Sequence, residues 1–189
     1  KPNSLRFSNS NWYSVSNSGT FTVNAAAGGA AQDIGGLCRD YDQATNCANG
    51  LQVAVAVNAV LTASTTTSGG SWTISAVTIA TNDILTLFVD NASTASSSVA
   101  VTKYDGTGSA TGIKLFARHL TIGSEDNQTL TNTDLGTFDN SVSGDADVFH
   151  DVAAGVLTVD TSNLLSDEEL YVLTLNTYAP GANFTTHDL

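Results

Sequence analysis

The seven residues Leu51–Val57 read LQVAVAV, and they predict a β-strand. Branched aliphatic side chains occupy every second position, and the positions between them are small or polar. Because side chains of a strand alternate between its two faces, the pattern indicates a half-buried strand of a two-layer β protein. The alternation recurs at Ile84–Asp90 (ILTLFVD), where both faces are apolar enough for a central strand.

Further short strands with turn signals between them fill the rest of the chain. We expect strands at 20–24, 51–61, 72–79, 84–90, 99–104, 112–122, 148–152, 156–160 and 170–175. A turn is expected at 62–70, a helical turn within 130–138 and a bulge near Arg118–His119. The short 80–83 connection and the Asp105–Gly106 step each predict a hairpin. This spacing predicts an all-β fold with little or no helix, an Ig-like or jelly-roll β-sandwich.

Length and composition suit one such domain. The chain has 189 residues, of which 41% are hydrophobic, enough to bury a core. We divide it into a polar N-terminal arm at 1–19, which is a donor strand or an edge strand, and a single β-sandwich domain at 20–189.

The charge balance argues against nucleic acid as a partner. Six basic against 18 acidic residues give a net charge of −12, which disfavours nucleic acid because phosphates would be repelled. The acidity would keep an abundant extracellular protein in solution or attract divalent cations. No apolar stretch is long enough for a membrane span.

Two cysteines, Cys38 and Cys47, enclose the polar stretch RDYDQATN. We expect them to form a local disulfide, since two cysteines without a nearby histidine make a poor zinc site. Closing so short a loop stabilises a fold by roughly 2–3 kcal/mol in the chain-entropy model. The rest of the composition is typical of a secreted protein, in the extracellular space or on a cell surface, and this favours the disulfide.

An acidic loop is the candidate metal site. Oxygen-bearing side chains alternate along it, as calcium prefers, at Asp139, Ser141, Ser143, Asp145 and Asp147. The spacing begins like an EF-hand loop, but His150 stands where that loop has its final glutamate. The alternative is a solvated acidic turn without an ion.

No catalytic signature accompanies these features, so we do not predict an enzyme. The three histidines, His119, His150 and His187, are far apart and share no motif. Trp12, Tyr13, Trp72 and Tyr178 are candidates for stacking on sugars, although a core position is the commoner role for an aromatic such as Trp72 at a strand start.

The arm suggests how copies of the chain would associate. An extended segment can add a strand to the sheet of a neighbouring subunit, and repeated addition grows a filament. The residues expected to act in self-assembly are Leu5, Phe7, Trp12, Tyr13 and Val15. The alternative is that the arm is an edge strand of its own domain.

Residues 50–189 resemble a known kind of module. The stretches VAVAVNAVL, SGGSWTISAVTI and NDILTLFVDN follow one another as in an uncharacterised β-rich module of very large repetitive bacterial cell-surface proteins. The resemblance implies an extracellular structural or adhesive unit, and it brings no catalytic residues.

Together these observations predict a structural subunit of an extracellular filament, tubule or surface layer, whose partners are copies of itself. The alternative is a carbohydrate-binding or adhesion module that recognises surface glycans.

Overall fold

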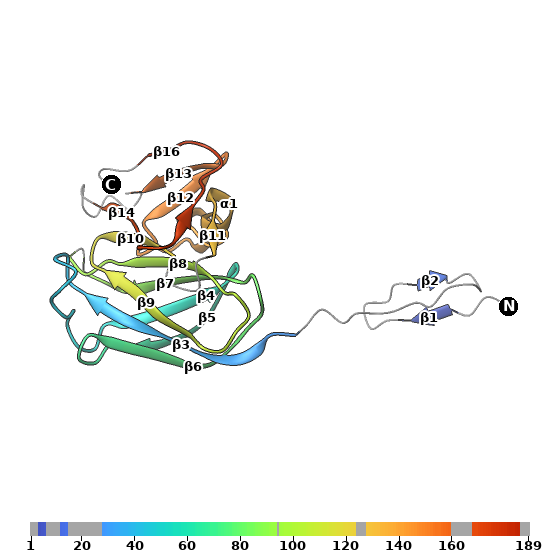
Figure 1. The fold of residues 1–189 in the computed structure, drawn as a ribbon, viewed down its shortest axis with the longest axis horizontal. Coiled ribbons are helices and arrows are strands. Elements are labelled where there is room, and N and C mark those ends of the chain that lie inside the picture. The colour runs from blue at the N-terminus through green and yellow to red at the C-terminus, as the bar shows by residue number, and fades with distance from the viewer. Residues whose placement is uncertain are drawn as a thin grey trace.

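A computed structural model describes residues 4–6, 12–14, 28–93, 95–123, 128–159 and 168–185, the first two segments by their backbone only. A six-stranded sheet lies at its centre (Figure 1). Its strands in spatial order are β14 (Glu169–Val172), β10 (His119–Ile122), β8 (Val99–Lys103), β7 (Ile84–Asp90), β4 (Gln52–Val57) and β5 (Val60–Thr66). The pairs β8–β10 and β10–β14 are parallel, and the others are antiparallel.

A second sheet packs on one face of the first. It has three strands in the order β6 (Ser71–Ile79), β3 (Ala30–Arg39) and β9 (Ala110–Phe116). Branched and aromatic side chains of both sheets fill the space between them, with Val53, Leu87 and Ile113 fully buried. The prediction of an all-β fold with packed sheets is confirmed.

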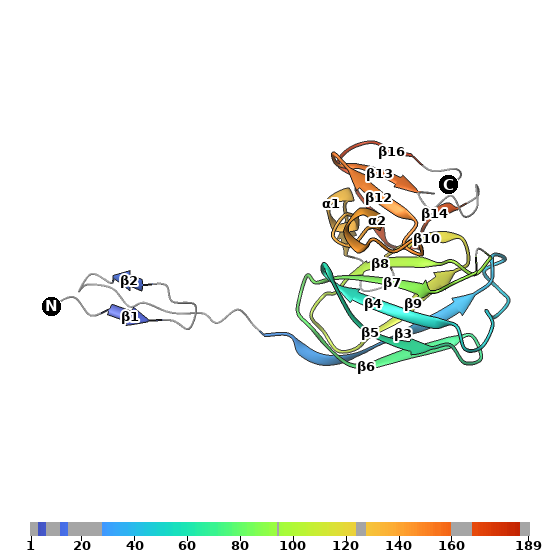
Figure 2. The same cartoon turned by 180° about the vertical axis from the view of Figure 1, so that it is seen from behind.

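A third layer covers the other face of the central sheet (Figures 1 and 2). Its elements are β11 (Thr129–Leu130), α1 (Asn132–Leu135), α2 (Asn140–Ser143), β12 (His150–Ala153), β13 (Val156–Val159), β15 (Thr177–Tyr178) and β16 (Phe184–Thr185). A second core forms here, where Phe88 and Ile122 of the sheet pack among Phe138, Phe149 and Leu157. Two-layer packing with a half-buried β4 was therefore the wrong prediction.

The alternation in β4 explains why this sheet serves two cores. Val53 and Val55 belong to the core with the second sheet, whereas Ala54 and Ala56 belong to the core with the third layer. All four are at most 1% exposed. The alanine face, small enough to look solvent-facing in the sequence, is covered by residues more than 70 positions further along.

The single strand predicted at 51–61 is two strands. Asn58 adopts a left-handed φ of 53°, and the chain reverses through Asn58 and Ala59 between β4 and β5. Asn58 tolerates this conformation, and its side chain donates to Asp83 Oδ1 and accepts from the Ile84 amide, both at 3.0 Å. The turn predicted at 62–70 is wrong for residues 62–66, because these residues belong to β5.

Both predicted hairpins are also wrong. β6 pairs with β3, while β7 pairs with β4 and β8, so the 80–83 connection crosses from one sheet to the other. The Asp105–Gly106 turn likewise joins β8 of the central sheet to β9 of the second. At Arg118, with φ 60°, the chain crosses again from β9 to β10, and this sheet change stands where a bulge was predicted.

Candidate functional site

Three of the five predicted metal ligands shape a turn. Asp139 caps α2, and its Oδ1 accepts hydrogen bonds from the Val142 amide (2.9 Å) and from Ser141 Oγ (2.8 Å). Its Oδ2 accepts from the Val152 amide at 3.0 Å. Ser143 Oγ accepts from the Asp145 amide at 3.2 Å. Both oxygens of the Asp139 carboxylate are thus used within the chain.

The other two predicted ligands meet a residue that the sequence pattern did not include. Asp145 and Asp147 lie beside Asp90 at the end of β7, and one carboxylate oxygen from each lies within 4.8 Å of the others. Burial raises the pKa of Asp147, and the charges of Asp145 and Asp90 raise it further. Three carboxylates are ligands that calcium accepts, and calcium binding stays a prediction.

The predicted self-assembly residues lie at the edge of what the structure describes. β1 (Ser4–Arg6) pairs antiparallel with β2 (Trp12–Ser14), with Leu5 opposite Tyr13. Phe7 and Val15 lie outside the described residues, as does His187. Donation of the arm to a neighbour stays a prediction.

The disulfide between Cys38 and Cys47 is confirmed. Within the loop that it closes, Asp42 Oδ1 accepts hydrogen bonds from the amides of Ala44 (3.0 Å) and Thr45 (2.8 Å). Thr45 Oγ1 also donates to Asp42 Oδ2 at 2.6 Å. This hydrogen bond lowers the pKa of Asp42 most, and the two amide hydrogen bonds lower it further. The loop is therefore held both covalently and by a carboxylate at its centre.

This loop reaches across to β10 and β14. The Tyr41 hydroxyl donates to the Glu169 carboxylate, whose other oxygen lies 3.2 Å from His119 Nε2. The Gln43 side-chain amide lies 3.4 Å from the same nitrogen of His119. The Arg118 guanidinium lies 3.9 Å from the centre of the Tyr41 ring. A polar and aromatic network thus joins the disulfide loop to the central sheet.

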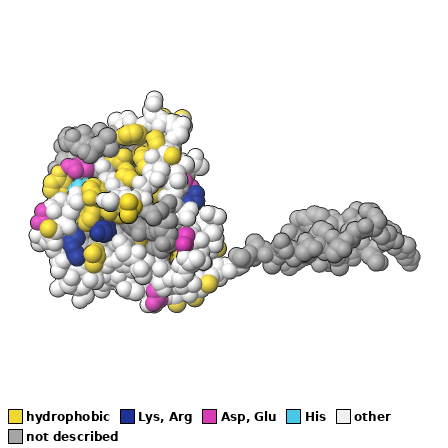
Figure 3. Space-filling view, in the orientation of Figure 1, with side chains coloured by type: hydrophobic (Ala, Val, Ile, Leu, Met, Phe, Trp, Pro, Cys, Tyr) yellow, Lys and Arg dark blue, Asp and Glu magenta, His cyan; other side chains and the backbone are white. Residues whose placement is uncertain are grey.

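A cavity of about 390 Å³ opens beside this network. It is lined by Gln43, Gly112, Lys114, Phe116, Tyr171, Leu173, Thr174 and Asn176. Half-buried Tyr171 meets the rings of Phe116 (5.4 Å) and His119 (6.0 Å) edge to face. Figure 3 shows hydrophobic, basic and acidic side chains gathered on the left of the body, over β9, β10 and β14. We name this cavity the Tyr171 pocket.

Strained backbone surrounds the Tyr171 pocket. Gln43, Arg118 and Leu175 have φ of 60°, 60° and 68°. This left-handed region is uncommon for residues other than glycine, asparagine and aspartate. Such conformations cluster at binding sites, where the surrounding structure enforces them. The sequence marks only Arg118, through the change of apolar face at Arg118–His119, and nothing in it indicates that Gln43 and Tyr171 line one cavity.

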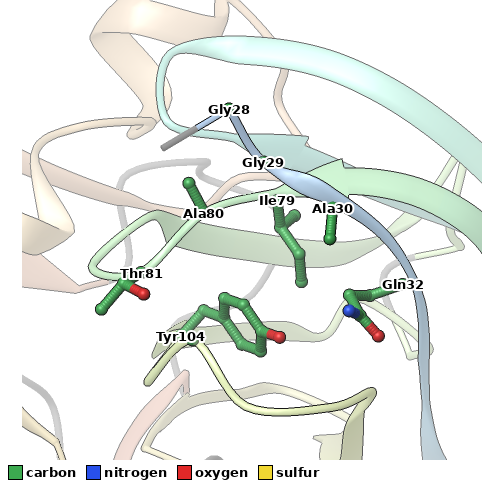
Figure 4. Close-up of a pocket in the computed structure, with 9 residues that line it drawn as sticks. Gly28, Gly29, Ala30, Gln32, Ile79, Ala80, Thr81 and Tyr104 are labelled. Atoms are coloured by element: carbon green, nitrogen blue, oxygen red, sulfur yellow. The ribbon is translucent and has the colours of Figure 1, made fainter. Parts of the chain in front are cut away.

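Two further cavities in the described part of the chain are smaller. One of about 160 Å³ lies beside the start of β3, between Ile79 and Tyr104 (Figure 4). Its remaining lining is mainly glycine and alanine, and the Tyr104 hydroxyl is committed to the Gly108 carbonyl at 2.5 Å. Another, of about 230 Å³, lies over β4 and β5 beside Leu61 and Asp90.

The aromatic candidates for sugar stacking belong to three different strands, β6, β15 and β2. Trp72 is 3% exposed in the core between the two sheets, in agreement with a structural role. Tyr178 is half-buried and its hydroxyl donates to Asn132 Oδ1; burial raises its pKa to about 12. Trp12 and Tyr13 belong to β2, of which only the backbone is described.

Comparisons with protein-family models, with curated proteins and with solved structures found no match to this chain. The two helices in the described ranges have four residues each, and neither is long enough to cross a membrane.

Proposed function

We propose that the chain is a structural subunit of an extracellular filament, tubule or surface layer, and that subunits associate by adding the N-terminal arm to a neighbour's sheet. The observation that carries the proposal is the open edge of β5. This strand is last in the central sheet, with β4 on one side and no described strand on the other. An edge strand presents unpaired N–H and C=O groups that another chain can bind.

The side chains of β5 leave this edge accessible. Its seven residues, VLTASTT, include no charge and no proline, the usual protections of an edge. Val60 is 64% exposed and Leu61 is 56% exposed, so an incoming strand would also bury apolar surface. Thr62 is an extra residue in β5 that shifts its register with β4. After Thr62, residues Ala63–Thr66 pair regularly with β4.

The other edges of the central and second sheets are less suitable. β14 has four residues and begins with Glu169, and β9 carries Lys114. β6 is interrupted in its interior at Ala76, whose φ is 58°, whereas the irregularity of β5 lies near its start. Charges, short length and irregular backbone all disfavour pairing at an edge.

The charges of the arm and the body are complementary. Residues 1–19 contain Lys1 and Arg6 and no acidic residue, so all 18 acidic residues and only four basic ones lie in 20–189. The acidic group of Asp90, Asp145 and Asp147 adjoins the β4–β5 surface. Opposite charges favour encounter of an arm with a neighbouring body and discourage contact between bodies.

Electron microscopy of purified protein tests the proposal. The full chain is expected to form polymers, and a chain lacking residues 1–15 is expected to stay dispersed. Leu61→Lys places a charge on the β5 edge and should also block polymers. Leu175→Lys is the matched control, because Leu175 is 81% exposed but lies outside every strand. Polymers of the truncated chain would rule out arm donation, and polymers of Leu61→Lys would rule out β5 as the acceptor.

Two features support an extracellular location for this subunit. The Cys38–Cys47 disulfide is compatible with an oxidising compartment. The resemblance of residues 50–189 to modules of large bacterial surface proteins favours a cell surface.

A second candidate function is a carbohydrate-binding or adhesion module. The Tyr171 pocket favours it, because an aromatic ring, two side-chain amides and a hydroxyl converge there from separate segments of the chain.

A further inference from the structure

We infer that the Tyr171 pocket binds one pyranose residue of a glycan. The inference rests on the second candidate function and names its site, which differs from the arm aromatics Trp12 and Tyr13 considered from the sequence. Four segments form the pocket: the disulfide loop, β9, β14 and the turn after β14.

The chemistry of the lining matches that of a sugar ring. A pyranose has apolar C–H faces and a rim of hydroxyls that both donate and accept hydrogen bonds. Tyr171 offers an aromatic surface with a polar tip. Gln43 carries a donor and an acceptor on one side chain, Asn176 Nδ2 has a second N–H beside the one that it donates to the Thr174 carbonyl (3.3 Å), and the Thr174 hydroxyl both donates and accepts. The volume of about 390 Å³ is at the lower end of ligand-binding cavities, which suits a small ligand.

The pocket is fixed before a ligand arrives. The disulfide and the Asp42 carboxylate hold the loop that carries Gln43. Tyr41 and His119 hold opposite oxygens of Glu169, which immobilises the start of β14 just before Tyr171. A preorganised site loses less conformational entropy on binding, so a few contacts suffice for measurable affinity.

The left-handed backbone supports the same conclusion. Gln43 lines the pocket and Leu175 lies in the chain between the lining residues Thr174 and Asn176, and each is held in a conformation that its residue type disfavours. Asp42 and the disulfide enforce this conformation at Gln43. A glycine would fit position 43 with less strain, but it would remove the side-chain amide from the pocket.

Ligand-observed NMR of the full chain tests the inference. The probes are the methyl glycosides of glucose, galactose, N-acetylglucosamine and glucuronic acid, measured by saturation transfer. At least one is expected to receive saturation from the wild-type protein. Gln43→Gly and Tyr171→Ala should each weaken that probe's binding by about tenfold or more. Phe184→Ala removes a half-exposed aromatic elsewhere and should leave binding unchanged.

The outcomes separate the site from the function. Binding that persists in folded Gln43→Gly and is lost in Trp12→Ala would overturn the Tyr171 pocket and leave a carbohydrate-binding module standing. Absence of saturation for all four probes would overturn both. If Tyr171→Ala does not fold, Gln43→Gly still decides the test. Residue 43 is in the disulfide loop, and glycine there relieves backbone strain.

Discussion

The Nε2 atom of His150 lies 3.1 Å from the main-chain oxygen of Leu135, and this contact joins the start of β12 to the end of α1. Because the oxygen only accepts, Nε2 carries the proton, and Nδ1 of the neutral ring is buried without a hydrogen-bond partner in the described residues. The third layer is therefore built around a neutral, fully buried imidazole.

Stability should fall as the solution is acidified below about pH 6.5. Burial lowers the pKa of His150 from its ordinary 6.5, only partly offset by the Leu135 carbonyl and by Asp139 and Asp151. Below 6.5 the unfolded chain takes up a proton that the folded chain does not, so the free energy of unfolding decreases by up to about 1.4 kcal/mol per pH unit. Thermal unfolding between about pH 7.5 and 5.5 measures this loss.

His150→Gln is the control for this pH dependence. Glutamine keeps a side-chain N–H for the Leu135 oxygen and does not titrate. The variant should be less stable at neutral pH, and its melting temperature should vary less between the two pH values. An equal pH dependence in both proteins would show that another group is responsible.

Asp147→Asn should stabilise the protein at neutral pH. The raised pKa of Asp147, caused first by burial and then by Asp145 and Asp90, means that its negative charge is unfavourable in the fold. In the wild-type protein the Asn91 amide donates to Asp147 Oδ2 at 2.7 Å. Asparagine removes the charge, and its side-chain oxygen can still accept this hydrogen bond. After screening by solvent the gain is about 0.5 kcal/mol. Chemical denaturation at low and high salt checks this, since the gain should shrink as salt rises. A loss of stability would contradict it.

Gln43→Gly should raise the free energy of unfolding by up to about 1 kcal/mol, because glycine adopts positive φ without steric strain. Ala44→Gly is the matched control, since Ala44 is in the same loop but not in a left-handed conformation. It should lose stability through added chain entropy in the unfolded state. Urea denaturation of the two variants measures the difference, and a stability loss at both positions would mean that Gln43 is not strained.

Gly36→Ala should destabilise the second sheet strongly. A Cβ at Gly36 would lie 1.8 Å from the carbonyl oxygen of Ile113 and 2.9 Å from Trp72 Cζ2, so β3 would have to separate from β9. We expect a loss of about 3 kcal/mol or more, at the upper end for overpacking. At Gly35 the nearest atoms are 3.2 Å away, and Gly35→Ala should cost about 1 kcal/mol. Urea denaturation compares them; equal losses would refute the steric explanation.

Local patterns predicted individual elements well. The doubly apolar ILTLFVD stretch is β7, which lies between β4 and β8 with six of its seven residues buried. The Cys38–Cys47 disulfide and the helical turn at Asn132–Leu135 were also visible, because each depends on residues close together in the chain.

Features that depend on distant segments were not predictable. A turn motif such as Asp105–Gly106 encodes a reversal of direction, and nothing in it states whether the next strand joins the same sheet. Asp90 reaches Asp147 only because the α2–β12 connection folds back onto the end of β7. Gln43 and Tyr171 line one cavity although 127 residues separate them in the printed sequence.

The position of β3 has a mechanical consequence. β3 follows the N-terminal arm in the sequence, it pairs with β6 from Ala30 to Leu37 and with β9 from Ile34 to Arg39, and its far end is anchored by Cys38. A pull on the arm would load both ladders in shear, so their hydrogen bonds would have to rupture together rather than unzip one at a time. β6 and β9 would therefore take up the load at once, and the covalent bridge would keep the Cys38–Cys47 loop from lengthening. The start of β3 is thus a place where this fold would resist tension by shear.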